Sequence, residues 1–433
     1  LVFLNSSLKN LIIYSYFCGV RKLLVNIICL ISFPAFSATY TTAVSGDWDN
    51  LNTWVVSGLT PSSLPGTSDD VILNHDVFIQ SDQLAHSYCQ TIEIADGVTL
   101  HLDATETRKL QIIGSTTNLT CTIDGTISNG KIHFSRLRTI SGSGSIDNVH
   151  LLINNWIVYC NVDISVSRIT MTVGASFVLG SSSTATINGP VTKAQDGGSI
   201  TNNGTFIINN SEFLGSSSIQ SSSDVFKSQN GNIELNYTGD FPLSKDEAFE
   251  NVSILGGSIT ADGNFSVSGN WVNNATFNSS SGNTITFNGS SSTSITATGI
   301  NNFHNILLNK TFGGLTLGDG SSNKPTINLF DVMETSSGNF TQDGATVVLK
   351  SNASNNGAIV VGSSLNYQHT SGAFTSELFY NATKHGYRMV CSPIKSSTLA
   401  ELDDEYIFCG IDGATANNNF SFGGCGFYNV KTY

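Results

Sequence analysis

The sequence predicts an all-β protein whose main part is a right-handed parallel β-helix, an elongated β-solenoid. Three observations carry this prediction: low charge, short apolar runs that alternate with polar positions, and a tight-turn dipeptide after most of these runs. Charged residues make up 12% of the 433 residues, whereas globular domains average about 25%. A hydrophobic fraction of 39% allows a buried core and excludes wholesale disorder.

Alternating runs of four or five residues recur along the chain, and this period of two is typical of half-buried strands. Clear examples are 98–102, 205–208, 232–235, 284–287 and 346–349. Turn dipeptides separate such runs: Asn-Gly at 129, 188, 203, 230, 288 and 356, and Asp-Gly at 96, 124, 262, 319 and 343. These residues accept the positive φ that tight turns require. The best helical candidate, 397–406, would form only one or two turns.

The internal repeat favours a solenoid over a row of immunoglobulin-like sandwiches. Sandwiches would show self-similarity near 100 residues, whereas the clearest echo here is nine residues long and pairs 198–206 with 257–265. A solenoid needs only one short coil per repeat and tolerates coils of unequal length. The Asn pairs at 154, 202, 209, 273 and 301 fit stacked amide ladders along such a rod, or ordinary turns.

The N-terminus predicts export. Arg21 and Lys22 precede an apolar run of about 11 residues, short of the ~20 that span a bilayer. Small residues at Ala35 and Ser37 then suit cleavage, so residues 1–38 are predicted to be a signal peptide, with a membrane anchor as the alternative. The chain does not begin with Met, so its first residues fit upstream read-through. The expected location is extracellular and attached to the cell surface, with membrane contact only through export or anchoring.

Six cysteines remain after the leader, and no CxxC motif occurs among them, which argues against zinc. An exported chain permits disulfides. Cys391, Cys409 and Cys425 are close enough in sequence for one pair among them. The alternative is buried free thiols stacked in the solenoid interior.

The charge balance argues against nucleic acid as a partner. Lys and Arg number 19 against 32 Asp and Glu, and no basic stripe is visible in the sequence. An acidic chain could instead bind Ca²⁺ through carboxylates. Asp69, Asp70 and Asp76 are the candidate ligands, and solvated loops are the alternative. No other cofactor is expected.

The catalytic motifs of polysaccharide-degrading enzymes are incomplete. One class of glycosidases with the β-helix fold carries four motifs in a fixed order: Asn-x-Asp, Asp-Asp, His-Gly and Arg-x-Lys. Here 161–163 and 385–386 match the first and third, but no Asp-Asp lies between them and no Arg-x-Lys follows. Acid–base hydrolysis needs two carboxylates across one bond. A lyase would use an Arg or Lys base beside Ca²⁺, for which the candidates are Arg108, Arg136, Arg138 and Arg168 near Asp103, Asp124, Asp147 and Asp163; surface ion pairs are the alternative.

The tryptophans are candidates for stacking on sugars. Trp48, Trp54 and Trp271 could bind glycans if their rings were exposed. For Trp48 and Trp54 a second interpretation is stronger, because the first coil of a solenoid needs a cover.

Three stretches resemble known modules. Residues 45–54 with 64–73 resemble the opening module of repetitive surface proteins exported by the type IX route of Bacteroidetes-type bacteria, and the eight-glycine domain of animal extracellular proteins. Residues 269–277 with 286–289 and 303–306 resemble a repeat common in the same bacterial proteins, and 386–393 resembles a module that follows those repeats. The resemblance implies secretion, a β-helical repeat region and a chain that continues toward a sorting domain. It brings no catalytic residues.

The expected organisation after the leader is an N-terminal capping, eight-glycine-like module over 39–105, solenoid repeats over 106–380, and the start of a second small β module over 381–433. The expected function is an adhesin-like or scaffold role toward extracellular polysaccharide, cell-surface glycans or other cells. A polysaccharide lyase or glycoside hydrolase on a groove of the rod is the alternative. A spacer for a further domain is the third possibility.

Overall fold

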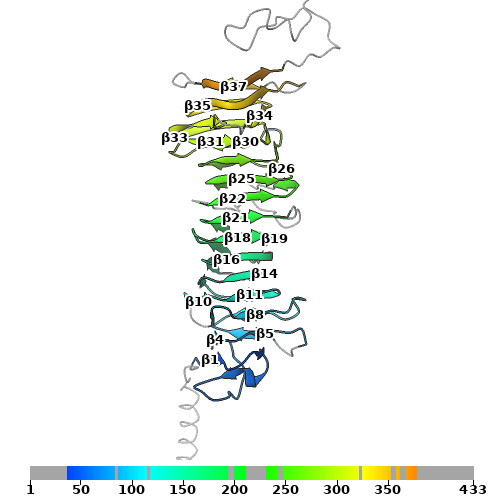
Figure 1. The fold of residues 1–433 in the computed structure, drawn as a ribbon, viewed down its shortest axis with the longest axis vertical. Helices are drawn as coiled ribbons and strands as arrows, with labels where there is room; N and C mark the ends of the chain where they lie inside the picture. Colours follow the sequence, from blue (N-terminus) through cyan, green and yellow to red (C-terminus); the bar gives the residue numbers. More distant parts are fainter. Residues whose placement is uncertain are drawn as a thin grey trace, which may run out of the picture.

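The computed structural model describes residues 37–82, 86–114, 118–193, 199–210, 231–241, 247–320, 324–352, 357–360 and 367–377. In these ranges the chain is nearly all β-strand, and parallel strands stack coil upon coil into a long rod (Figure 1). The predicted β-solenoid is therefore confirmed. The leader over 1–36, the helical candidate over 397–406 and the module over 381–433 lie outside the described residues. Within the described ranges, no helix has the length and apolarity needed to cross a bilayer.

Within the described ranges, most coils contribute one strand to each of three faces. The first face consists of β2 (Gly46–Asp47), β5 (Val77–Phe78), β8 (Thr99–His101), β11 (Thr126–Ser128), the starts of β14 (Ser145–Ile153) and β16 (Asp163–Met171), β18 (Thr184–Ile187), β21 (Thr205–Ile208), β22 (Asn232–Asn236), β25 (Asn251–Gly256), β28 (Trp271–Asn273), β31 (Thr293–Thr296), the end of β33 (Asn305–Leu317), the middle of β35 (Val332–Leu349) and the start of β37 (Tyr367–Ser376).

The second face follows the first along the chain and begins with the second coil. It consists of β6 (Ser87–Cys89), β9 (Leu110–Ile112), β12 (Lys131–Phe134), the ends of β14 and β16, β19 (Val191–Lys193), β23 (Gly239–Phe241), β26 (Ser258–Ala261), β29 (Thr276–Ser279), β32 (Ile300–Phe303), β34 (Thr326–Leu329) and the ends of β35 and β37.

The third face completes each coil. It consists of β1 (Thr39–Thr42), β4 (Asp70–Leu73), β7 (Thr91–Ile94), β10 (Leu119–Ile123), β13 (Arg138–Ser141), β15 (Ile157–Cys160), β17 (Ser176–Leu179), β20 (Ser199–Asn202), β24 (Glu247–Phe249), β27 (Phe265–Val267), β30 (Thr284–Phe287), the starts of β33 and β35, and β36 (Ala358–Val360).

A continuous apolar core fills the rod because alternate residues of each strand point inward. In β21, Phe206 and Ile208 are fully buried, while Thr205 and Ile207 face outward and are half-buried. The strand registers place aliphatic residues of successive coils over one another: Ile146 lies over Ile164 on the first face, and Leu151 lies over Ile169 on the second. The alternating runs seen in the sequence are therefore strands with one buried edge.

The N-terminal end is closed by aromatic residues. The short 3-10 turn η1 (Leu51–Thr53) and β3 (Trp54–Val55) fold back so that β3 pairs antiparallel with β1. Trp48 and Trp54 pack edge to face with ring centroids 5.0 Å apart, and Trp54 Nε1 donates to the Trp48 carbonyl at 2.8 Å. Parallel coils then run without interruption through the expected domain boundary at 105/106, since β8 pairs with β11 and β9 with β12.

Asparagines form both inner and outer hydrogen bonds between coils. On the outside of the second face, Asn328 Nδ2 donates to Asn302 Oδ1 at 2.6 Å, and Asn302 Nδ2 donates to Asn278 Oδ1 at 2.7 Å. Inside the rod, Asn301 Oδ1 accepts from Asn273 Nδ2 at 2.9 Å and from Trp271 Nε1 at 2.8 Å. At these positions the ladder interpretation holds. The pair Asn154–Asn155 instead agrees with the turn interpretation, because Asn155 has a φ of 57°.

Three cysteines are buried free thiols: Cys89, Cys121 and Cys160. Cys121 and Cys160 follow the same inward register of the third face, where each pairs with Ile140. Burial raises the pKa of Cys121 to about 11 and that of Cys160 to about 12, so both are protonated at neutral pH. The interior-thiol alternative is confirmed for these three, while Cys391, Cys409 and Cys425 lie outside the described residues.

Candidate functional site

Five basic residues stand in line on the N-terminal half of the second face, one on each successive coil. Lys131, His150 and Arg168 occupy the same register on β12, β14 and β16. Lys109 and His86 extend this line, because they directly precede Leu110 and Ser87, which pair with each other on β9 and β6. We call these five residues the basic column. We call each of its five positions a rung, numbered from His86 to Arg168. Neighbouring rungs are separated by the distance between stacked strands, about 4.8 Å.

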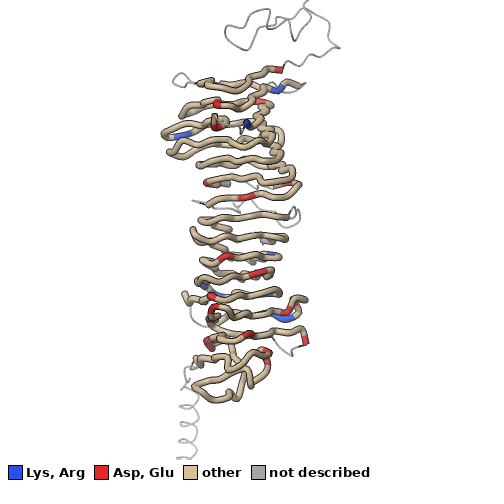
Figure 2. Tube along the Cα trace, in the orientation of Figure 1, with Lys and Arg blue, Asp and Glu red and all other residues tan. Residues whose placement is uncertain are grey.

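The cations of this column are not neutralised by carboxylates. Among the residues that the structure describes, none of Lys109, Lys131 or Arg168 forms an ion pair. Arg168 is exposed, and the two lysines are half-buried. Burial and the charge of Lys131 lower the pKa of Lys109. Lys and Arg positions are scattered along the rest of the rod (Figure 2), whereas here three cations that form no ion pair within the described ranges lie within four successive coils of one face.

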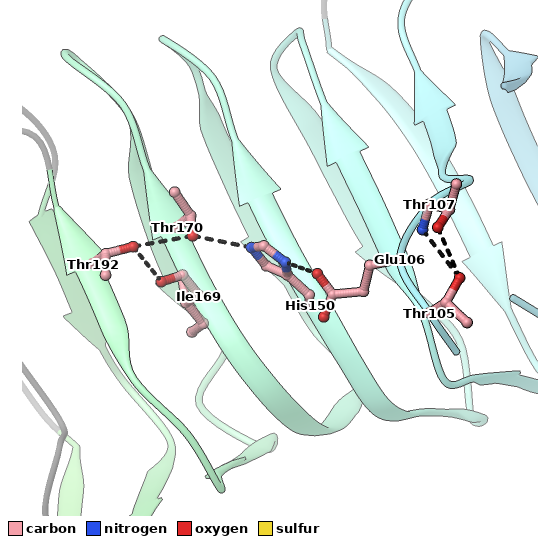
Figure 3. Close-up of polar contacts among 7 residues, drawn as sticks. All are labelled: Thr105, Glu106, Thr107, His150, Ile169, Thr170 and Thr192. Carbon is pink, nitrogen blue, oxygen red and sulfur yellow. Dashed lines mark hydrogen bonds and ion pairs between the residues drawn. The ribbon is translucent and has the colours of Figure 1, made fainter. Parts of the chain in front are cut away.

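The fourth rung is held by a carboxylate from a neighbouring loop. Glu106 Oε2 lies 2.7 Å from His150 Nδ1, and His150 Nε2 lies 3.0 Å from Thr170 Oγ1 (Figure 3). Burial lowers the pKa of His150, and Lys131 and Arg168 add to this, whereas the contact with Glu106 opposes it. The pair orients the imidazole across the strands, and Thr192 Oγ1 continues the chain by donating to Thr170 Oγ1 at 3.0 Å.

The loop that carries Glu106 is built around one aspartate. Asp103 accepts hydrogen bonds from the backbone amides of Thr105 at 2.9 Å and Arg108 at 2.8 Å. Burial would raise the pKa of Asp103, but these bonds outweigh it and lower the pKa, so the carboxylate stays charged. The bonds turn the chain back on itself and place Glu106 at a φ of 58°. Non-glycine residues rarely adopt this left-handed conformation, which persists where the surroundings fix it.

A second outward row of polar side chains runs beside the basic column. Tyr88 on β6 lies in register with Gln111 on β9, which lies in register with His133 on β12. His133 Nδ1 lies 3.2 Å from Gln111 Oε1, and its Nε2 lies 3.1 Å from Ser135 Oγ. Burial, then the nearby charges of the column, lower the pKa of His133 to about 4. At neutral pH the ring is uncharged and offers one donor and one acceptor.

Three solvent-shielded polar atoms beside the first two rungs lack a hydrogen-bond partner: His86 Nδ1, Ser87 Oγ and Arg108 Nε. Burying a polar group without a partner is unfavourable by about 1–3 kcal/mol. Arg108 is close enough to His86 for its charge to lower the pKa of that histidine, after burial and Lys109. Unsatisfied donors therefore gather at the same end of the second face as the unpaired charges.

The predicted calcium ligands act as hydrogen-bond acceptors in turns. Asp69 accepts from the amides of Ala38 at 3.0 Å and Gly66 at 2.8 Å. Asp70 accepts from the Thr91 hydroxyl, and Asp76 accepts from the Thr99 amide at 2.8 Å. The described ranges contain no group of three or more His, Cys, Asp or Glu placed to hold a metal ion.

The tryptophans predicted to bind sugars lie in the core. Trp48 is 2% exposed, and Trp54 and Trp271 are fully buried. Stacking on a glycan requires an open ring face, so the expectation fails for these three in this structure. Trp48 and Trp54 instead form the cover of the first coil, which was the second interpretation of their positions. Trp271 packs among Phe265, Phe277 and other rings of the interior.

The arginines considered for lyase chemistry have separate surroundings. Arg138 is fully buried, and its guanidinium donates to the carbonyls of Gln90 at 3.2 Å and Leu137 at 2.8 Å. Arg136 lies over the Trp156 ring at 5.3 Å. Arg168 belongs to the basic column, and Arg108 lies in the Asp103 loop beside it. Of the aspartates, Asp103 shapes the loop described above, and the other three accept hydrogen bonds in turns or strands: Asp124 from Ser143, Asp147 from Ser145 and Asp163 from Thr184.

Comparison with family models, curated proteins and solved structures finds no match for this chain. The basic column was missed in the sequence because its members are 23, 22, 19 and 18 residues apart. A usable signal was present nonetheless. In four of the five coils the basic residue directly precedes the first inward aliphatic residue of the second face: Leu110, Ile132, Leu151 and Ile169.

Proposed function

We propose that this chain is an exported, non-enzymatic β-solenoid with an adhesin-like or scaffold role, which contacts extracellular polysaccharide or cell-surface glycans. One observation carries the proposal: unpaired basic side chains and a row of hydrogen-bonding side chains lie parallel along the second face of a straight rod. A flat, ladder-like surface of this kind suits an extended polymer more than a compact ligand. The hydroxyl and amide groups of the second row suit a partner rich in hydroxyls.

Nucleic acid is a less suitable partner for the same surface. The whole chain carries a formal net charge of −13, and phosphate backbones are bound mainly by accumulated positive charge. A glycan presents hydroxyl groups along its whole length, and the second row of polar side chains offers them hydrogen-bonding partners.

A binding and degradation screen tests the proposal. The purified chain is applied to a glycan array and incubated with neutral and acidic polysaccharides, with and without Ca²⁺. Saturable binding without new reducing ends or unsaturated products is the expected result. Product release would replace the proposal with a polysaccharide lyase or glycoside hydrolase. Absence of binding to every glycan would leave the spacer role.

A further inference from the structure

We propose that the basic column is the binding site of an anionic polysaccharide whose chain runs along the rod axis. The inference rests on the proposed glycan-binding function and adds the class of ligand, the site and the direction of the bound chain. Its basis is the juxtaposition of His86, Lys109, Lys131, His150 and Arg168 on five successive coils of one face.

The spacing of the column fits a repeating polymer. Five rungs at about 4.8 Å span about 19 Å, measured between the outer strands. A pyranose unit in an extended polysaccharide advances by a similar distance, so acidic sugars can meet the cations Lys109, Lys131 and Arg168. The buried His150 between the last two is held by Glu106 and spaces them without binding the ligand. A small anion would use only one or two of these rungs. The regular array is therefore explained by a ligand whose charges also repeat.

The charge pattern indicates that the ligand is anionic. Two lysines outside the column have local partners: Lys350 Nζ lies 2.5 Å from Glu377 Oε1, and the buried Lys310 Nζ donates to the carbonyls of Asn288 at 2.7 Å and Ser291 at 2.9 Å. Lys109 and Lys131 instead face each other in adjacent coils, where like charges repel. A bound carboxylate or sulfate would relieve that repulsion.

The second row supplies contacts for sugar hydroxyls. Tyr88 and Thr170 point outward and are half-buried, so their hydroxyls lie beside the column rather than beneath it. Gln111 is only 8% exposed, and Leu152 separates His133 from Thr170 in register. His86 Nδ1 and Arg108 Nε are shielded from solvent, so sugar oxygens would meet the outward hydroxyls of this row rather than these two atoms.

Binding of defined polymers to the full chain and to two variants tests the inference. The probes are polygalacturonate, which carries carboxylates, chondroitin sulfate, which carries sulfates as well, neutral dextran, and single-stranded DNA. In the test variant, Lys109→Gln, Lys131→Gln and Arg168→Gln are combined. The matched control is Lys324→Gln, which removes an exposed lysine outside the column. Circular dichroism checks that both variants keep the fold.

The expected result is saturable binding of polygalacturonate, chondroitin sulfate or both, weakened at least tenfold in the triple variant and unchanged in Lys324→Gln. Affinity should fall with added salt, and more steeply for the parent chain. The triple variant has fewer cations in contact with the polymer, so its binding releases fewer counterions. Oligogalacturonates should gain affinity up to about four units and then level off, since the cations Lys109 and Arg168 are three strand spacings, about 14 Å, apart. Which polymer binds identifies carboxylate or sulfate as the recognised group.

Three results would overturn the inference. Equal weakening in Lys324→Gln would show general charge attraction, and tighter binding of DNA than of either acidic polysaccharide would assign the column to nucleic acid. Binding of dextran that survives the triple substitution, without binding of the acidic polymers, would refute the column while leaving the proposed glycan-binding function intact. If no glycan binds at all, both fail together.

Discussion

Replacing Asn301 with alanine is expected to destabilise the middle of the rod by about 3–5 kcal/mol. Asn301 is fully buried, and its Oδ1 accepts from Trp271 Nε1 at 2.8 Å and from Asn273 Nδ2 at 2.9 Å. Alanine leaves Trp271 Nε1 buried without an acceptor and removes one of the two acceptors of Asn273 Nδ2, which keeps the Ile300 carbonyl at 3.0 Å. Each lost bond costs about 1–3 kcal/mol. The carbonyls of Gly299 and Thr326, each 3.3 Å from Asn301 Nδ2, also lose a donor.

The adjacent residue provides a matched control. Asn302 faces outward in the same strand and is only half-buried, and its amide bonds to Asn278 and Asn328 lie where water can replace them. Asn302→Ala is therefore expected to cost about 1 kcal/mol or less. Guanidinium unfolding followed by circular dichroism gives both values. Hydrogen exchange of the amides near Trp271 locates the loss, because a repeat array can open locally.

Two outcomes would refute this reasoning. A loss below about 1 kcal/mol for Asn301→Ala would mean that water or a shifted neighbour satisfies the stranded donors. Equal losses for the two variants would mean that inner and outer asparagines contribute alike, contrary to their difference in burial.

Further predictions concern pH and the N-terminal cover. The pKa of His133 is about 4 in the folded chain, so acid protonates the unfolded state first, and the free energy of unfolding should fall by about 1–3 kcal/mol between pH 6.5 and 4. His133→Gln should remove this part of the pH dependence in urea titrations, and an unchanged profile would contradict the assignment. Trp54→Ala should lower stability by about 3–5 kcal/mol through the cavity it leaves. Loss of edge-to-face packing on Trp48 should shift the near-ultraviolet dichroism, and a variant as stable as the parent would argue against the covering role.

The fold was accessible from the sequence because its determinants are local. Period-two runs such as 205–208 and 284–287 are strands with alternate residues buried, as predicted. Gly97 adopts a φ of 73° in a predicted Asp-Gly turn. At Gly125 glycine is required for lack of space, since a Cβ there would lie 2.2 Å from the Val98 carbonyl oxygen of the neighbouring coil. The turn dipeptides thus mark corners for two physical reasons, positive φ and close approach of coils.

The nine-residue echo shows the limit of local inference. Its first copy includes β20 and the start of β21, which lie on the third and first faces, whereas its second includes β26 and the start of β27, on the second and third. The repeated unit is a strand–corner–strand, and it recurs at different corners of the coil.

The candidate site could not be found in the same way. Its members come together only when coils of unequal length are stacked in register, and that register follows from packing across the core. The loop at 103–108 shows why: it lengthens its coil without shifting the strands, so Lys109 and Lys131 stay aligned. The spacing of the basic residues does not reveal this alignment. The signal that does exist, a basic residue directly before the first inward aliphatic residue, can be used only once the strands of the second face are known.

The stacking of coils also determines how the rod would respond to tension. One full coil, followed from the first face around to the first face again, runs from Ile233 to its register partner Val252. It adds only about 4.8 Å to the height of the stack. Drawn out straight, the same 19 residues would span about 65 Å. Pulling the two ends of the polypeptide apart loads the hydrogen bonds between an end coil and its neighbour in sequence, so coils would detach singly from the ends. Each detachment would multiply the length of that coil more than tenfold, and a tether of this kind absorbs sudden force by lengthening in steps.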